Sequence, residues 1–454
     1  MSTITTALLT SNRSIRSGIG NSIDPTGFIV RPYISDIHNG IYNPNFTYTG
    51  GQAIVPDENG ILRRTPAGYP AVEGGAWSGT NWLPPTAGIT RSISTRKGLR
   101  TIQTADTFKG MLVEPAMTNK CTCRKSNPTD ITGLVKNGDA ASVLSVVNDA
   151  AALTAAGLSD ICTSGMVYKL DNSAGVGTAY VNSLATVGNT NPHSFSGYFR
   201  GGTGRLFDTV SGDGIALITA SANYVRYKLT LTPGLATRAW AVLADAGAIV
   251  YFILPQLEEN PFCTSIIAPA ADTAASQTRA ASVVSASTSG VFPMVSATAA
   301  QDFAIFMRVV PKGINARGIF SSYLNATNYL SISSDAGGNM ISRKLTAGVN
   351  DQIITPAVFS EDVVSQIIFV LTKSGISVKY KKNSGAWSSW SILDTETAKL
   401  PTVISGTYVI GGRQDIGQFT ANYPRTAIIA MPPKATLAEY QTWIDEELTL
   451  RGLI

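Results

Sequence analysis

The sequence predicts an all-β protein: two antiparallel jelly-roll-like sandwiches in series after an extended N-terminal arm, with a short C-terminal helix. Two observations favour this fold. Only 14% of the 454 residues are charged, whereas glycine, serine, threonine, alanine and asparagine are abundant, a composition typical of turn-rich β structure. Short apolar stretches also recur with Gly or Asp turns between them, and helical heptads are absent. The length leaves room for roughly two to four domains.

Residues 1–45 are predicted to form an N-terminal anchoring arm. They show no sustained apolar period, and Gly18, Pro25 and Pro32 stand among polar residues. Arms of this kind become ordered when they pack on something else, so we expect the segment to anchor the chain or to contact other copies of it. A disordered leader is the alternative.

Residues 46–120 are predicted to form a small β-rich region. The segment is rich in Gly, Pro and Trp, and Gln52–Val55 and Ile61–Arg64 flank a turn at Asp57–Gly60. The pattern leaves two arrangements open: a separate β unit, or the first strands of the sandwich that follows.

Residues 121–284 form the first predicted sandwich. Asn148 or Asp149 can cap an Ala-rich helical turn that ends near Gly157. Short strands at regular spacing, separated by turns, indicate an antiparallel sandwich. The predicted strands are Val143–Val147, Gly165–Leu170, Ser194–Phe199, Ile215–Thr219, Tyr224–Leu231, Trp240–Leu243 and Ile249–Leu254.

A joint between the two sandwiches is predicted from Gln256 to Arg279. The part through Ile267 should be the ordered last strand of the first sandwich, with Phe262 buried. The segment Ala268–Gly290 is rich in Ala, Ser and Thr, and we expect it to be a linker that is free to set the angle between the sandwiches.

Residues 285–454 form the second predicted sandwich. Phe303, Ile305, Met307 and Val309 alternate with other residues, as on one face of a strand. The other predicted strands are Ile367–Leu371, Ile376–Tyr380, Tyr408–Ile410 and Ala427–Met431, the first two forming a hairpin.

The chain ends in the clearest helix signal of the sequence. Thr436 and Glu439 form a capping box, in which each side chain accepts a hydrogen bond from a backbone amide near the other residue. Four apolar residues then follow at helical spacing, and Gly452 can end the helix. We expect the apolar face, Leu437, Tyr440, Ile444 and Leu448, to pack on the second sandwich.

Charge and cysteine usage argue against several functions. The formal net charge is +5 without a dense basic block, so no nucleic-acid partner is expected. The most apolar stretch, Trp240–Leu254, is too short to span a bilayer and reads as a hairpin, so no membrane insertion is expected. The single C-x-C at Cys121 and Cys123 lacks the second pair that a zinc site needs. We predict free thiols, no metal and no cofactor.

Catalytic residues are not predicted. His38 falls in the arm and His193 in a turn, where a surface or turn role is expected, and no nucleophile elbow, phosphate loop or H-E-x-x-H motif is present. The two carboxylates of a glycosidase need only meet in space, which sequence spacing does not reveal. Glu258 and Glu259, being adjacent in a strand, should face opposite ways.

Three stretches of the sequence are distinctive. Residues 109–119 read KGMLVEPAMTN, and residues 256–269 read QLEENPFCTSIIAP, followed by TRAA at 278–281. The first is similar to the phrase G-L-L-[IV]-E-P-A-x-T-N and the second to Q-L-E-x-G-x-x-x-T-S-Y-I-P with a trailing T-R-A-A. Both phrases resemble those of carbohydrate-binding-module-like jelly rolls in bacteriophage tail-fibre and other virion appendage proteins. From about residue 300 the chain resembles concanavalin-A-like or laminin-G-like sandwiches.

The resemblance implies a non-enzymatic structural protein of a tailed bacteriophage, located in the virion and made in the host cytoplasm. It implies a tail-fibre or head-fibre appendage that attaches through residues 1–45 to portal, collar, tail or capsid proteins. The lectin-like modules would then serve host attachment by binding surface glycans as receptor, in a homo-oligomer such as a trimer. Two alternatives stay open: a capsid or collar decoration protein without a receptor role, and a cell-surface polysaccharide depolymerase.

Sugar binding requires flat aromatic faces with polar side chains nearby. Trp387 and Trp390, beside the turn at 383–385, are the predicted glycan-binding pair, with Arg413, Asp415 and Tyr423 as neighbours. Packing of at least one of these tryptophans in the core is the alternative.

Other polar and aromatic residues are expected to be structural. Tyr198, Tyr224 and Tyr227 lie in or beside predicted strands of the first sandwich and should pack there. The segment from Asp335 to Asn339 is predicted to be a plain turn, with a calcium loop as the alternative.

Overall fold

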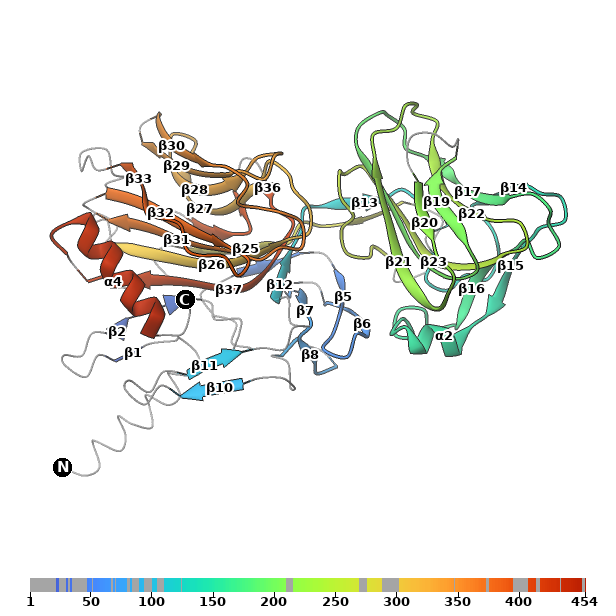
Figure 1. Ribbon diagram of the computed structural model, residues 1–454, viewed down its shortest axis with the longest axis horizontal. Helices are drawn as coiled ribbons and strands as arrows, with labels where there is room; N and C mark the ends of the chain where they lie inside the picture. The colour runs from blue at the N-terminus through green and yellow to red at the C-terminus, as the bar shows by residue number, and fades with distance from the viewer. Residues whose placement is uncertain are drawn as a thin grey trace, which may run out of the picture. The chain divides into compact units, whose positions relative to one another are not determined.

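The computed structural model describes the chain in two compact units, each built almost entirely from antiparallel strands (Figure 1). Unit 1 takes residues 1–49, 68–115 and 282–454, and unit 2 takes residues 50–67 and 116–281. The all-β prediction is confirmed. The described residues are 22–23, 30–31, 33–34, 47–50, 52–66, 68–69, 71–79, 82–83, 90–93, 100–103, 110–123, 125–209, 215–268, 276–287, 302–346, 348–372, 375–394, 407–413, 417–432, 434–450 and 454.

Unit 2 is a sandwich of two five-stranded sheets. The β14 sheet has the order β14 (Leu134–Gly138), β17 (Ala179–Thr186), β22 (Ala239–Ala244), β19 (Gly204–Asp208) and β20 (Ile215–Ile218). The β15 sheet has the order β15 (Val143–Asn148), β16 (Met166–Asp171), β23 (Ile249–Glu258), β18 (His193–Gly201) and β21 (Ser221–Leu231). All seven strands predicted for this sandwich are therefore present, with ends that differ by a few residues.

The core of unit 2 is aromatic. Trp240 lies fully buried and donates its indole N–H to the backbone oxygen of Ser196 at 3.0 Å, which satisfies its one polar atom. Phe199 stacks on it with ring centroids 6.2 Å apart, and the ring centroid of Phe252 lies 5.7 Å from that of Trp240.

A short helix and a hairpin are added to this sandwich. The helix α2 (Ala150–Ala155) ends two residues before Gly157, close to the predicted end, and the hairpin joins β5 (Ile54–Pro56) to β6 (Leu62–Arg64). The Leu62 amide donates to the Gly157 oxygen at 2.8 Å. Gly157 has φ +71°, and a Cβ there would lie 2.4 Å from the Gly60 oxygen, so only glycine lets the hairpin approach so closely.

The stretch at residues 109–119, which resembles a phrase of phage appendage modules, is anchored in unit 2 by Asn119. This residue ends β13 (Met117–Asn119), which pairs with β24 (Gln277–Arg279) from the second phrase. The Asn119 amide nitrogen donates to the backbone oxygens of Pro255 and Ile267 at 3.1 and 3.2 Å, and its oxygen accepts from the amides of Cys121 and Leu257. One buried side chain therefore ties the start of the module to its last strand.

The second such stretch, residues 256–269, is anchored by Glu258. Its fully buried carboxylate accepts hydrogen bonds from the Thr264 hydroxyl at 2.5 Å, the Thr264 amide at 3.1 Å and the Gln256 side chain at 2.7 Å. Burial raises the pKa of Glu258. Phe262 is buried as predicted. The buried side chains of Asn119 and Glu258 therefore tie the two phrases into the fold of unit 2.

Unit 1 is a larger sandwich whose strands come from three segments of the chain. The β26 sheet has the order β33 (Ser391–Asp394), β32 (Gly375–Lys382), β31 (Ser365–Thr372), β26 (Phe303–Pro311), β37 (Ala421–Ala430), β12 (Gly110–Val113) and β7 (Ala71–Glu73), with β3 (Tyr33–Ile34) also on β37. The β27 sheet has the order β30 (Val349–Thr355), β29 (Met340–Thr346), β28 (Asn328–Ser334), β27 (Gly318–Asn325), β34 (Thr407–Ile410), β25 (Val283–Ser287) and β4 (Thr47–Thr49). The short strands β35 (Gly412–Arg413) and β36 (Gly417–Gln418) join β27. Three separate hairpins pair β1 (Ser22–Ile23) with β2 (Val30–Arg31), β8 (Ala76–Trp77) with β9 (Trp82–Leu83), and β10 (Thr90–Ile93) with β11 (Arg100–Gln103).

The two faces of β26 divide the apolar residues of unit 1 between two cores. The predicted alternating set, from Phe303 to Val309, belongs to the core between the sheets, as expected. Ala304 and Phe306, on the opposite face, belong to a second core with the helix α4 (Leu437–Leu450). Figure 1 shows α4 lying across this outer face of the β26 sheet. The helix therefore covers the face that would otherwise be exposed.

The helix begins as predicted. The Glu439 amide donates to the Thr436 hydroxyl at 3.3 Å, and the Glu439 carboxylate accepts from the amides of Ala435 and Thr436 at 2.9 and 3.3 Å. The capping box is confirmed, and the four predicted apolar residues all belong to the core under the helix. Gly452 lies outside the described residues.

The prediction of a free linker over Ala268–Gly290 is wrong for the described part of that segment. Within it, β24 pairs with β13 in unit 2, and β25 pairs with β34 and β4 in unit 1. Ala, Ser and Thr can build a strand when its pairing partners supply the apolar side chains, and in β25 Val284 joins the core between the sheets. The boundary between the units falls after Ala281.

The region 46–120 does not fold as one body. Its strands β4, β7 and β12 belong to unit 1, whereas the hairpin β5–β6 belongs to unit 2. In sequence, unit 2 is therefore inserted between strands of unit 1. Of the predicted arm, Tyr33–Ile34 pairs with Ile428 and Ile429 of unit 1.

Candidate functional site

The structure brings Trp387 and Trp390 together beside β32. Both are half-buried against the core under α4. The ammonium of Lys379 lies between them, with Nζ 5.1 Å from the Trp387 ring centroid and 4.9 Å from that of Trp390. Asp445 of α4 forms an ion pair with Lys379 and accepts from the Trp390 indole N–H at 3.3 Å. We call these four residues the Lys379 cluster.

The Lys379 cluster is closed by α4. The Lys379 side chain is 8% exposed, although an ammonium normally stays in water. Its partners are two aromatic faces and one carboxylate, which replace the lost hydration. The cluster therefore fixes the helix to the β26 sheet, and both tryptophans are partly buried against the core under α4.

The other predicted neighbours lie apart from the tryptophans. Tyr423 is fully buried in the core between the two sheets, where burial raises the pKa of its phenol. Arg413 lies in β35 of the β27 sheet and is 6% exposed. Its guanidinium lies 5.0 Å from the Tyr329 ring centroid. Asp415 lies outside the described residues. The four described residues of the predicted site therefore do not line one surface.

A second cation–aromatic cluster lies on the outer face of the β15 sheet in unit 2. Lys169, Tyr251 and Arg200 are register partners on the neighbouring strands β16, β23 and β18, so they form a row across the sheet at about 4.8 Å per strand. Tyr224, on the next strand β21, completes the row. The Arg200 Cζ atom lies 4.0 Å from the Tyr251 ring centroid and 5.5 Å from that of Tyr224. With Asp149, these residues form the Arg200 cluster.

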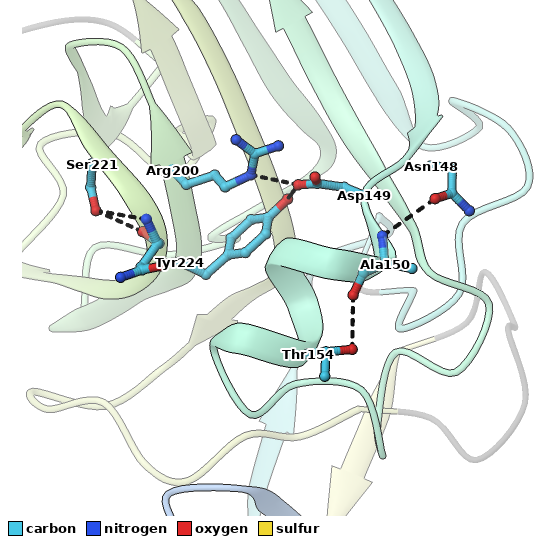
Figure 2. A network of polar contacts seen from close by, with 8 residues as sticks. Asn148, Asp149, Ala150, Thr154, Arg200, Ser221 and Tyr224 are labelled. Atoms are coloured by element: carbon cyan, nitrogen blue, oxygen red, sulfur yellow. Dashed lines mark hydrogen bonds and ion pairs between the residues drawn. The ribbon is translucent and has the colours of Figure 1, made fainter.

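Asp149 holds the row in place from the start of α2. Its Oδ2 atom accepts from Arg200 Nε at 2.5 Å and from the Tyr224 hydroxyl at 2.7 Å. Its side chain makes no capping bond to the helix, so the carboxylate is committed to the cluster. Figure 2 shows this arrangement, with the two terminal nitrogens of Arg200 turned away from Asp149.

The electrostatics keep the Arg200 cluster in one protonation state. Burial opposes the charge of Arg200, but the hydrogen bond and charge of Asp149 outweigh it and raise the pKa of Arg200. Burial and the bond to Asp149 raise the pKa of Tyr224, which stays a neutral donor. The ion pair of Lys169 and Asp171, at 2.8 Å, raises the pKa of Lys169 and helps to lower that of Asp171 to about 2.

The Arg200 cluster lies where the covered part of the face ends. Val167 and Ile253 lie two residues along their strands from Lys169 and Tyr251, and hence on the same face. Both are fully buried, in the core cluster that also contains Leu153 of α2. The side chains of the row are more open, with Lys169 23% exposed and Arg200 19%. The row therefore meets solvent on a rigid, hydrogen-bonded support.

Sequence reasoning missed Arg200 and Tyr251. The predicted strand ended at Phe199, two residues before the end of β18, and Tyr251 fell in a strand predicted to be buried. The signal was present in the alternation of β18, where Phe195, Gly197 and Phe199 face the core and Arg200 therefore faces outward. Tyr224 was expected to be structural, and its bond to Asp149 bears this out.

The groups considered for catalysis have structural partners. His193 is fully buried at the start of β18, so its prediction as a surface or turn residue is wrong, and burial lowers its pKa. Glu259 bonds Lys120 at 3.0 Å and Asn191 at 2.7 Å on the surface, whereas Glu258 is buried, so the two carboxylates do face apart. No pair of accessible carboxylates follows from these two residues.

The segment from Asp335 to Asn339 forms a hydrogen-bonded turn. The Asp335 carboxylate accepts from the amides of Gly337 and Asn339 and from the Asn339 side chain, which is the predicted turn. Within the described ranges, no group of three or more metal-ligating side chains gathers. No helix in those ranges is both long and apolar enough to cross a bilayer. The four cysteines are buried free thiols.

No family model matches the chain, and no curated protein sequence is detectably similar to it. Three solved structures illustrate its likeness to others. The Ruminococcus gnavus IT-sialidase CBM40 bound to alpha2,3 sialyllactose is 14% identical, over 32% of this chain and 83% of that one, with a TM-score of 0.24. The tail fibre protein gp63.1 from an E. coli phage is 10% identical over 69% of this chain and 42% of that one (TM-score 0.23), and mouse laminin alpha1 domains LG4-5 are 9% identical over 54% and 84% (0.23). At these identities and TM-scores, neither a family nor a ligand follows from the likeness.

Proposed function

We propose that this chain is a non-enzymatic glycan-binding protein and that unit 2 holds the sugar at the Arg200 cluster. One observation carries the proposal: the Arg200 guanidinium rests on the Tyr251 ring at 4.0 Å, while its terminal nitrogens point away from Asp149. Polar ligands are recognised by a few donors that are fixed before binding, because less conformational entropy is then lost. Stacking and the Asp149 bond fix this donor plane.

Aromatic and polar groups of the right kind surround that donor plane. The Tyr251 ring is half-buried beside the donor plane, the buried Tyr224 supports that plane, and the ammonium of Lys169 lies 6.0 Å from the Tyr251 ring centroid. The Asp149 carboxylate is held by two bonds and is 12% exposed, which suits a positioning role rather than acid catalysis. Binding without turnover is the function that this arrangement supports best.

A glycan array with the full chain tests this proposal. Wild type should bind at least one class of surface glycan, and Arg200→Ala should weaken that binding by more than about tenfold. Lys228→Ala is the matched control, because it removes an exposed positive charge from β21 in the same sheet. Equal binding by the Arg200→Ala and control proteins would overturn the site. Release of reducing ends from host polysaccharide would instead show a depolymerase.

The biological setting is part of the same proposal. The phrases at 109–119 and 256–269 resemble those of phage appendages, so we place the chain in the virion, made in the host cytoplasm, as a homo-oligomer docked through residues 1–45. Deletion of residues 1–45 should abolish attachment to the particle while the remaining chain still binds glycan. If particles lacking the protein adsorb normally to cells, the role is decoration without receptor binding.

A further inference from the structure

We infer that the saccharide bound at the Arg200 cluster carries a carboxylate, which pairs with the two terminal nitrogens of Arg200. This inference rests on the proposed function and deepens it by naming the ligand class. It follows from the number, direction and rigidity of the donors that remain at Arg200.

The donors of Arg200 are divided between the protein and the open face. Nε is committed to Asp149 at 2.5 Å, and this bond fixes the rotation of the guanidinium about its last side-chain bond. Nη1 and Nη2 form the fork turned away from Asp149 in Figure 2. A guanidinium fork matches the two oxygens of a carboxylate in one plane, and such charge-assisted bonds are roughly twice as strong as neutral ones. A sugar hydroxyl is neutral and has a single acceptor oxygen, so it neither matches both nitrogens nor adds the attraction of an opposite charge.

The surroundings of the two terminal nitrogens increase the difference in affinity between a charged and a neutral ligand. The Arg200 side chain is 19% exposed and its plane lies on the Tyr251 ring, so water competes less for its donors than it would for a free surface arginine. Lys169 adds a second positive charge beside the same ring, 6.0 Å from its centroid. Its partner Asp171 pairs with it at 2.8 Å, which leaves further ammonium protons for a ligand.

The neighbouring positions on the sheet leave room for the chain of a saccharide. Ser145, on β15, is the register partner of Lys169 and extends the row to the edge of the sheet with a small side chain. A polysaccharide can therefore run across the strands with one acidic group over Arg200.

Calorimetry with the full chain and three oligosaccharides of equal length tests the inference. The first is a uronic-acid oligomer, and the second is the same oligomer with its carboxyl groups reduced to alcohols. The third is an oligomer that carries sulfate groups in place of carboxylates. The uronic-acid oligomer should bind at least about tenfold more tightly than the other two, and raised salt should reduce this preference. Arg200→Lys, which keeps the charge and removes the fork, should lose most of the preference while the protein stays folded. Lys228→Ala should keep it.

The outcomes separate the inference from the proposed function. Equal binding of the acidic and reduced oligomers would overturn the carboxylate inference and leave glycan binding in place. Equal or tighter binding of the sulfated oligomer would show that the fork recognises any anion, which also overturns it. If wild type binds neither these oligomers nor any glycan on the array, the proposed function itself fails.

Discussion

The Lys379 cluster of unit 1 and the Arg200 cluster of unit 2 contain the same parts: a cation, two aromatic rings and a carboxylate that fixes the cation. In the first, α4 supplies the carboxylate and covers the cluster, so the ammonium is 8% exposed. In the second, the carboxylate comes from the start of α2, beside the row, and the guanidinium keeps two donors directed away from it. Residue composition therefore does not identify a binding site. A binding site is identified by the exposure of the cation and by the direction of the donors that its carboxylate leaves unbonded.

Mutation of the Lys379 cluster should mainly lower the free energy of unfolding. Lys379→Ala should lower the free energy of unfolding of unit 1 by about 2 kcal/mol, because two indole contacts and the partner of Asp445 are lost together. Urea unfolding followed by tryptophan fluorescence measures this well, since Trp240 is the only one of the six tryptophans in unit 2. Lys379→Met, which keeps the apolar stem, should recover part of the loss. A loss under about 0.5 kcal/mol for Lys379→Ala would mean that α4 is held by its apolar face alone.

Mutation of the Arg200 cluster should lower the free energy of unfolding by less. Tyr224→Phe removes one hydroxyl, 2.7 Å from Asp149, while Arg200 still bonds the same oxygen. We expect a loss of about 1 kcal/mol in the unfolding of unit 2, and glycan binding weakened by about threefold as the Arg200 plane becomes less fixed. Tyr227→Phe is the control, because its hydroxyl bonds Thr219 outside the cluster. If binding falls as far in Tyr227→Phe as in Tyr224→Phe, the cluster is not the site.

The smallest expected effect is that of pH on binding. Folding raises the pKa of Arg200 and Lys169 and lowers that of Asp171 to about 2, so none of these charges changes between about pH 5 and pH 9. The stability contributed by Asp171 is present above its unfolded pKa of about 4 and is lost as pH falls through about 2. Affinity should therefore vary less than about twofold over about pH 5 to 9. A midpoint near about pH 6 to 7 would indicate a titrating group outside the cluster.

Much of the secondary structure could be predicted because its signal is local. The alternation from Phe303 to Val309 and the capping box at Thr436 each lie within a few residues, and both formed as expected. The pairing of β4 with β25 could not be predicted, because it joins residues more than two hundred positions apart that carry mostly small polar side chains. The same reason explains why Ala268–Gly290 read as a linker.

The site was harder to predict than the strands. Tyr423 was predicted to be a neighbour of the tryptophans, and the strand that follows it was predicted to begin at Ala427, whereas β37 begins at Ala421 and turns Tyr423 into the core. The tryptophans carry the stronger sequence signal for sugar binding, but the sequence does not show that α4 covers them. Arg200 carries a weak signal, since its role depends on Tyr251 and Asp149, each about fifty residues away in the chain.

A crystal structure of the full chain with a bound uronic-acid oligosaccharide tests the central claim most directly. We predict density for the sugar on the outer face of the β15 sheet, with a carboxylate within about 3 Å of the terminal nitrogens of Arg200. The Lys379 cluster should be unchanged, with α4 in place over Trp387 and Trp390. Density stacked on those two tryptophans, with the Arg200 cluster empty, would contradict the account.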